Sequence, residues 1–187
     1  MKRIAIFASG TGTNAANIIR YFDDNHDISV KAVLSNNPTA GVLNVAKEAG
    51  VDSLVFTREE FYETDKVIRY LLDNQIDLVV LAGFLWLVPE LFIQSFPKKI
   101  INIHPALLPA FGGKGMYGAR VHQAVKAANK QETGITIHYV NPHYDEGDII
   151  FQTSCSLSDD DTPDTIAAKV HKLEYEFYPK VIGQLLN

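Results

Sequence analysis

The sequence predicts an α/β protein with a Rossmann-like, mostly parallel sheet, helices on both faces and an antiparallel strand pair in its C-terminal part. Three observations predict this fold. Short apolar runs alternate with helix-like segments through the first half of the chain. Residues 77–82 are apolar on both faces, as in a central parallel strand. Residues 133–140 and 148–155 are strand-like segments joined by a short polar loop, which is typical of an antiparallel pair.

The individual elements follow from local signals. A glycine-rich turn ends the first strand, Gly50 closes the second helix, and Thr162 with Pro163 opens the last helix as N-cap and first helical residue. The expected strands are 2–8, 28–34, 53–56, 77–82, 99–103, 133–140 and 148–155. The expected helices are 13–22, 41–50, 58–74, one after the loop 104–118, and one from 162 to about 178.

Size and charge limit the possible functions. A chain of 187 residues fits one domain, 1–187, with a substantial core. The net charge is −5, and nucleic-acid-binding domains usually carry an excess of basic residues. A large nucleic-acid partner is therefore not expected. The single cysteine, Cys155, lies in a strand and reads as a packed thiol, as in a reducing compartment. No leader peptide or apolar run of about 20 residues is present, so we expect a cytoplasmic protein without membrane contact.

The segment Ser9-Gly-Thr-Gly-Thr-Asn14 lies between the first strand and the first helix. Backbone amides at a helix N-terminus, left open by small residues, form a cradle for a phosphate. Dinucleotide-binding loops carry a third glycine, which is replaced here by Ala15. The Asp or Glu that would bind the ribose of a dinucleotide is also missing after Leu34. The loop therefore favours a monophosphate over a dinucleotide, with a plain tight turn as the alternative.

Asn102 and His104 stand at the carboxyl end of a predicted strand and point to the same side of it. Ligands of open α/β sheets bind at these strand ends. An amide N–H beside an imidazole suits an oxygen that gains negative charge, and histidine can carry a proton near neutral pH. The alternative is a buried histidine that only forms structural hydrogen bonds.

Asp145 lies in the loop of the antiparallel pair, within Asp145-Glu-Gly147. A carboxylate beside His104 would orient the imidazole and raise its pKa. Asp and Gly in such a loop also suit an ordinary turn. The six histidines show no zinc spacing, and no nucleophile elbow occurs, so no metal site and no covalent catalysis are expected.

Gly83-Phe-Leu-Trp-Leu-Val-Pro89 follows the central strand. An apolar, aromatic segment at a strand end can form the wall of a pocket for a flat heterocycle. Core packing with one exposed tryptophan explains the same pattern.

Read together, these segments resemble the phosphoribosylglycinamide formyltransferase family, folate-dependent enzymes of purine synthesis. The resemblance covers nearly the whole chain. Its most specific part is Asn102-Ile-His-Pro-Ala-Leu-Leu-Pro109, which is typical of folate-linked formyltransferases and hydrolases. It implies that 10-formyltetrahydrofolate is the co-substrate and that glycinamide ribonucleotide accepts the formyl group, in a monomer or homodimer without a metal.

The resemblance also implies site residues. Asn102, His104 and Asp145 would be catalytic, with Asp145 keeping His104 protonated. Residues 1–83 would form the phosphate-binding half and 84–187 the folate-binding and catalytic half. The substrate-binding residues would be Gly12, Thr13, Asn14 and, for the ribose, Glu174. The folate-binding residues would be Leu85, Trp86, Leu87, Val88, Asn102 and Arg58.

One loop departs from the family pattern. Many relatives carry a basic residue and a short Pro-Gly turn after Leu-Leu-Pro, whereas this chain has Ala110-Phe-Gly-Gly-Lys-Gly115, where Lys114 can supply the charge. Alternatives remain among other folate formyl enzymes: methionyl-tRNA and sugar-nucleotide formyltransferases or a formyltetrahydrofolate hydrolase. A nicotinamide-dependent oxidoreductase and a catalytically silent nucleotide-binding module are alternatives of other classes.

Overall fold

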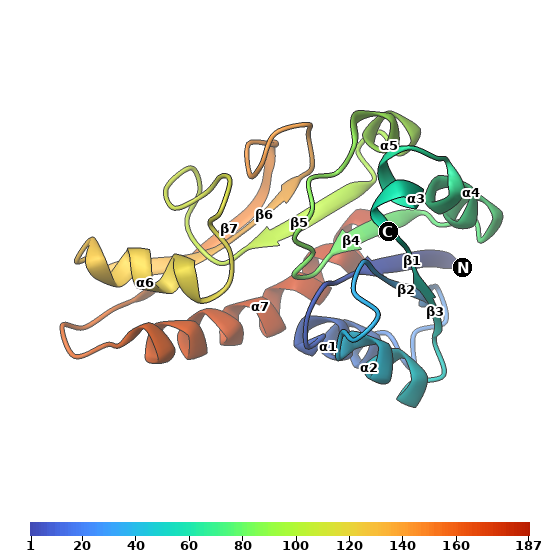
Figure 1. The fold of residues 1–187 in the computed structure, drawn as a ribbon. Helices are drawn as coiled ribbons and strands as arrows, with labels where there is room; N and C mark the ends of the chain where they lie inside the picture. Colours follow the sequence, from blue (N-terminus) through green and yellow to red (C-terminus); the bar gives the residue numbers. More distant parts are fainter.

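The computed structural model describes all residues, 1–187, and is built on one seven-stranded sheet (Figure 1). The strand order is β3-β2-β1-β4-β5-β6-β7. The strands are β1 (Lys2–Phe7), β2 (Ile28–Ser35), β3 (Asp52–Val55), β4 (Leu78–Leu81), β5 (Ile100–His104), β6 (Glu132–Tyr139) and β7 (Ile149–Ser156). The helices are α1 (Thr13–Tyr21), α2 (Val42–Glu48), α3 (Arg58–Tyr62), α4 (Lys66–Asp73), α5 (Glu90–Ser95), α6 (Ala119–Ala127) and α7 (Pro163–Leu186).

The sheet confirms the predicted fold class. The five strands β1 to β5 are parallel to one another, and β6 and β7 continue the sheet in antiparallel pairing. The order reverses between β1 and β4, which is the switch point where open α/β sheets hold ligands. The carboxyl ends of β1, β4 and β5 therefore meet at one edge.

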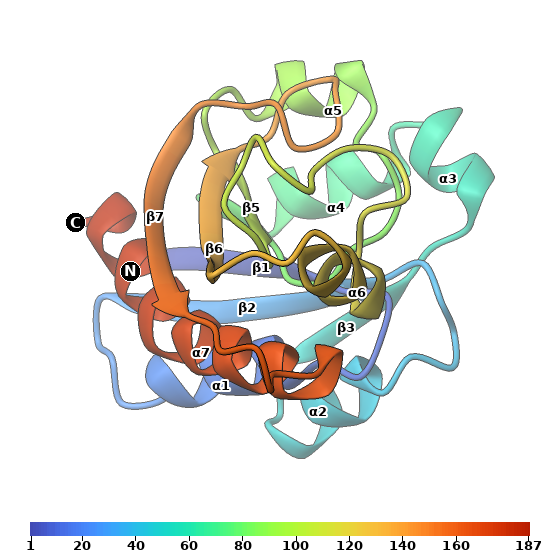
Figure 2. The same cartoon turned by 90° about the vertical axis from the view of Figure 1, so that its left-hand side faces the viewer.

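Helices cover both faces of the sheet, so the fold has three layers (Figure 2). On one face α1, α2, α6 and α7 pack on a core that includes Ile6, Val33 and Ile101. On the other face α3, α4 and α5 pack on an aromatic core around Phe7, which meets the rings of Phe84 and Phe92 edge-on. None of the helices is both long enough and apolar enough to cross a bilayer.

The predicted helix 58–74 is wrong as a continuous element, because it is two helices, α3 and α4. A Thr57–Glu60 capping box opens α3. The Thr64 hydroxyl then donates to the Glu60 carbonyl at 3.0 Å and accepts from the Lys66 N–H at 3.3 Å. Such side-chain bonds take the place of backbone bonds and end one helix while starting the next.

The end of the last helix was also predicted wrongly, since α7 runs through Pro179 to Leu186 instead of stopping near residue 178. A proline inside a helix lacks the N–H that would bond the carbonyl four residues earlier, here that of Tyr175. The Asn17 side chain of α1 donates to this carbonyl at 2.8 Å. The freed carbonyl is thus satisfied from another helix, and α7 continues. The short helix α5, after Pro89, was not predicted at all.

Candidate active site

A cavity of about 640 Å³ opens at the carboxyl edge of the sheet. Its size is typical of a small-molecule site. It is lined by the β1–α1 loop, the segment after β4, the end of β5, the loop before α6, the β6–β7 loop and part of α7. All the site residues predicted from the sequence line it except Arg58.

The β1–α1 loop presents open backbone amides to the cavity. Gly12 caps α1 with φ of 83°, a left-handed conformation that favours glycine, and a Cβ there would lie 2.7 Å from Val42. No side chain caps α1, and the N–H groups of Thr13, Asn14 and Ala15 have no hydrogen-bond partner in the protein. These amides and the helix dipole favour an anion.

Glu174 projects from α7 toward the same loop. Its Oε2 accepts a hydrogen bond of 2.9 Å from Asn14 Nδ2, although 160 residues separate the two. One turn later, the fully buried Tyr178 hydroxyl donates to the Leu81 carbonyl at 2.9 Å and ties α7 to the end of β4. Burial raises the pKa of Glu174, although the Asn14 bond and His171 lower it in part. The β1–α1 loop and Glu174 are thus brought together at one side of the cavity.

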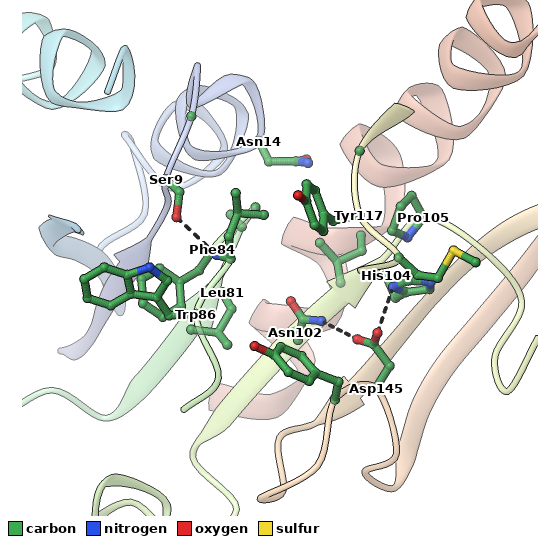
Figure 3. Close-up of a pocket in the computed structure, with 18 of the residues that line it drawn as sticks. Ser9, Asn14, Leu81, Phe84, Trp86, Asn102, His104, Pro105, Tyr117 and Asp145 are labelled. Atoms are coloured by element: carbon green, nitrogen blue, oxygen red, sulfur yellow. Dashed lines mark hydrogen bonds and ion pairs between the residues drawn. The ribbon is translucent and has the colours of Figure 1, made fainter. Parts of the chain in front are cut away.

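Asp145 is the centre of the polar cluster at the end of β5 (Figure 3). Its Oδ1 lies 3.5 Å from Asn102 Nδ2, and its Oδ2 lies 3.5 Å from His104 Nδ1. Gly113 N–H donates to Oδ2 at 2.9 Å and holds the carboxylate in place. The structure therefore brings Asn102, His104 and Asp145 together. The two side-chain separations are longer than good hydrogen bonds, so these groups can still respond to a ligand.

Burial decides the ionisation of His104. Its side chain is 3% exposed. Burial lowers the pKa of His104, while Asp145 and the Phe111 carbonyl, 2.8 Å from Nε2, raise it; the net pKa is lowered. Asp145 acts in the predicted direction, but burial has the larger effect, so the surroundings of the ring favour the neutral imidazole over the protonated one. Since a carbonyl only accepts, Nε2 carries the proton of the neutral ring.

The carboxyl group of Asp145 is ionised. Burial raises its pKa, but His138, His104 and the Gly113 N–H together lower it by more, so the net pKa lies below the ordinary range. An anion beside a neutral, buried imidazole stabilises that ring whenever it gains a proton. The pair is therefore suited to accept a proton and pass it on.

His138 belongs to the site and was missed in the sequence. It faces Asn102 across β5 and β6. Its Nδ1 bonds the Tyr139 carbonyl at 2.9 Å, so its Nε2 is free to accept from Asn102 Nδ2 at 3.2 Å. His138 thus orients the Asn102 amide. No sequence signal identified it, because a histidine inside a strand reads as ordinary core.

The segment after β4 walls the other side of the cavity. Leu85, Trp86, Leu87 and Val88 all line it. The Leu85 N–H donates to Ser9 Oγ at 3.1 Å, which joins this segment to the β1–α1 loop (Figure 3).

Arg58 lies outside the cavity lining but against this wall. Its guanidinium stacks on the rings of Tyr62, at 4.7 Å, and Trp86, at 5.7 Å. The Tyr62 hydroxyl donates to the Leu87 carbonyl at 2.8 Å, so the stack is fixed to the wall. Arg58 is thus held as an exposed cation beside the apolar surface of the cavity.

The loop that departs from the family pattern supplies cations of its own. Lys114 and Arg120 both line the cavity, and Arg120 stacks on Tyr117 at 5.0 Å. No group of three or more His, Cys, Asp or Glu side chains is placed to hold a metal ion.

Residues 2–182 match the family model described as formyl transferase. The phosphoribosylglycinamide formyltransferase of Bacillus subtilis is 37% identical over 192 residues, which cover all of this chain and 96% of the relative. The chain belongs to the phosphoribosylglycinamide formyltransferase family. The family predicted from the sequence is therefore confirmed, and the protein is a formyltransferase.

Other members of the phosphoribosylglycinamide formyltransferase family agree. A chloroplastic member from Arabidopsis thaliana is 38% identical over 98% of this chain, which spans 65% of that relative's length. The crystal structure of the member from Bacillus halodurans superposes with a TM-score of 0.88 at 35% identity, covering all of this chain and 96% of the other. The Rossmann-like fold is thus shared by family members.

Proposed function

We propose that this formyltransferase moves the formyl group of 10-formyltetrahydrofolate onto the amine of 5′-phosphoribosylglycinamide. The observation that carries the proposal is the position of the Asn102–His104–Asp145 cluster. It lies in one cavity with both an anion-binding helix N-terminus and an apolar aromatic wall. A phosphorylated amine and a flat heterocyclic donor need these two surfaces on either side of the reacting carbon.

The two halves of the chain divide the binding. Residues 1–83 contribute the phosphate loop, where the amides of Gly12, Thr13 and Asn14 receive the phosphate. Residues 84–187 contribute the remaining groups except Arg58, which comes from the first half. Glu174 binds the ribose, and the wall of residues 85–88 receives the pterin. Arg58, stacked on Trp86, pairs with a carboxylate of the folate tail.

Asn102 acts on the oxygen of the formyl group. The amine attacks the formyl carbon, and the carbonyl oxygen becomes an oxyanion. The Asn102 amide, oriented by His138, donates to this oxyanion in place of its long contact to Asp145. A donor held in advance costs no reorganisation when charge develops on the oxygen.

His104 and Asp145 carry the proton. The attacking nitrogen gives its proton to the neutral His104, and Asp145 stabilises the imidazolium that forms. The bond between the formyl carbon and N10 of the folate then breaks. Its electron pair stays on N10, which takes the proton from His104. The products are the formylated amine and tetrahydrofolate, with no covalent enzyme intermediate.

The test is to mix the protein with 10-formyltetrahydrofolate, with and without the ribonucleotide, and to follow both products. The proposal expects tetrahydrofolate and formylated ribonucleotide in equal amounts, and tetrahydrofolate formation only when the amine is present. Release of formate and tetrahydrofolate without the amine would instead identify a hydrolase and contradict the proposal.

A further inference from the structure

The loop after β5 contacts both His104 and Asp145 through its backbone. The Phe111 carbonyl lies 2.8 Å from His104 Nε2. Two residues later, the Gly113 N–H donates to Asp145 Oδ2 at 2.9 Å. This stretch belongs to the part of the loop that departs from the family pattern. Three consecutive residues, 111–113, therefore bond both groups of the pair.

Phe111 has an unusual backbone conformation. Its φ is 57°, in the left-handed region that residues other than glycine rarely adopt. Such a conformation persists only where the surrounding structure fixes it. The Phe111 side chain is half-buried and packs against the larger hydrophobic core, on the face of the sheet that α1, α2, α6 and α7 cover. The packed ring therefore anchors the backbone whose carbonyl bonds His104.

The two neighbours of the imidazole compete for its single proton. A carboxylate beside Nδ1 favours the Nδ1–H tautomer, as in a Ser-His-Asp triad. Here Asp145 Oδ2 lies 3.5 Å from Nδ1, which is too long for a good hydrogen bond (Figure 3). The Phe111 carbonyl lies closer to its own ring nitrogen, at 2.8 Å from Nε2. The shorter contact decides, so Nε2 carries the proton and Nδ1 keeps its lone pair.

The proposed reaction depends on that lone pair. His104 takes a proton from the attacking nitrogen, and Nδ1 is the only ring nitrogen that can accept it. If the proton were on Nδ1, the unprotonated nitrogen would be Nε2. A substrate nitrogen has no room between Nε2 and the Phe111 carbonyl, because these atoms are only 2.8 Å apart. The tautomer therefore decides whether the ring can act as a base.

We propose that Phe111 is a positioning residue, whose carbonyl holds His104 in the Nε2–H tautomer and so keeps Nδ1 unprotonated for the substrate's proton. The inference rests on the proposed function and adds to it a backbone group that acts through His104. The apolar side chain of Phe111 serves to hold the carbonyl in place.

The test reads the tautomer directly. Two-bond 1H–15N spectra distinguish the protonated from the unprotonated nitrogen of a neutral imidazole. They are recorded at about pH 8, above the usual pKa of histidine. The spectrum of His104→Gln identifies the signals of His104 among the six histidines. This readout is independent of activity, and kcat is measured alongside it with both substrates at saturation.

Four variants separate the role of the carbonyl from a general disturbance of the loop. Phe111→Gly loses the anchoring ring. Gly112→Ala displaces the segment, because its Cβ would lie 2.5 Å from Leu108 Cδ2 and 3.2 Å from Asp145 Cβ. Phe111→Leu keeps an apolar anchor. Gly115→Ala is the matched control in the same loop, since its Cβ would have a single neighbour, 4.0 Å away.

The wild type should show only the Nε2–H form of His104. Phe111→Gly and Gly112→Ala should shift the ring toward the Nδ1–H form and lower kcat about 5- to 10-fold, the factor by which one neutral hydrogen bond changes a ratio of two states. Phe111→Leu should restore the wild-type tautomer and most of kcat, and Gly115→Ala should keep the tautomer. Thermal unfolding and the Kd for tetrahydrofolate show whether each variant keeps its fold and its folate site.

Two results overturn the inference and leave the proposed function standing. One is that the folded Phe111→Gly and Gly112→Ala variants keep the Nε2–H form alone. The other is that their tautomer changes while kcat stays within about 2-fold of the wild type. A different result separates the two proposals: if the wild type holds the Nε2–H form but makes no formylated ribonucleotide, the proposed function is contradicted and the inference falls with it.

Discussion

Asp145 Oδ2 lies 3.5 Å from His104 Nδ1 and is held there by the Gly113 N–H at 2.9 Å. The carboxylate is thus fixed by one loop against an imidazole on β5. It raises the pKa of His104 but does not overcome the effect of burial. Without a ligand the two lowered pKa values favour an ionised Asp145 and a neutral His104, and this pair can accept one proton.

Replacing Asp145 by Asn should lower kcat about 10- to 100-fold, because the imidazolium loses its stabilising charge. It should also move the acid limb of the kcat/KM profile. Since Asp145 raises the pKa of His104, its removal lowers that pKa further, and the acid limb moves to lower pH. Initial rates between pH 5 and 9 measure both effects. An acid limb that stays in place would show that Asp145 does not control the protonation of His104.

Trp86 is the single tryptophan of the chain and lines the cavity, so its fluorescence should report folate binding. We expect tetrahydrofolate to quench it and Arg58→Ala to raise the Kd about 3- to 10-fold, since an exposed ion pair is worth up to about 1 kcal/mol. Arg69→Ala, at an exposed arginine paired with Asp65 on α4, is the matched control and should leave the Kd unchanged. Equal effects of the two variants would remove Arg58 from the folate site.

Gly12→Ala should raise the KM for the ribonucleotide about 10-fold or more. The added Cβ meets Val42 at 2.7 Å, and φ of 83° is unfavourable for alanine, so the phosphate loop has to move. The Kd for tetrahydrofolate should change little. In Gly10→Ala the Cβ meets nothing within 4 Å, so steady-state kinetics should show a smaller effect. Equal increases in the ribonucleotide KM for both variants would contradict this account of the loop.

His122 should make stability depend on pH. Its pKa is about 4 in the folded protein and about 6.5 when unfolded, so the unfolded chain binds more protons between these values. The contribution of His122 is complete above about pH 6.5 and is lost as the pH falls toward 4. Urea unfolding of wild type and His122→Asn at several pH values should show a difference that changes by about 1–2 kcal/mol over this range, after discounting for screening. A constant difference contradicts the buried, neutral ring.

Most of the fold could be predicted from the sequence, because apolar periodicity and turn residues act locally. The predicted helix ends were wrong where a side-chain hydrogen bond decided whether the helix stops or continues. The helix through Pro179 continues because Asn17, in α1, satisfies the carbonyl that the proline frees. The helix after Thr57 breaks because the Thr64 hydroxyl replaces a backbone donor.

The site was partly predictable for similar reasons. The strand pattern and the family motif placed Asn102, His104 and Asp145, and the structure brings them together. The net pKa of His104 was not predictable, because it depends on how deeply the ring is buried by segments far away in the chain. His138 was missed, because only the three-dimensional arrangement places its ring nitrogen against the Asn102 amide.

The most direct test of the account is the kcat of His104→Ala, measured with 10-formyltetrahydrofolate and the ribonucleotide at saturation, alongside the Kd from Trp86 fluorescence. We predict that kcat falls by about 100-fold or more, as for the loss of a general acid–base group, while the Kd for tetrahydrofolate stays within about 2-fold. A variant that binds the folate normally and retains kcat within about 5-fold of the wild type would contradict the proposed role of His104.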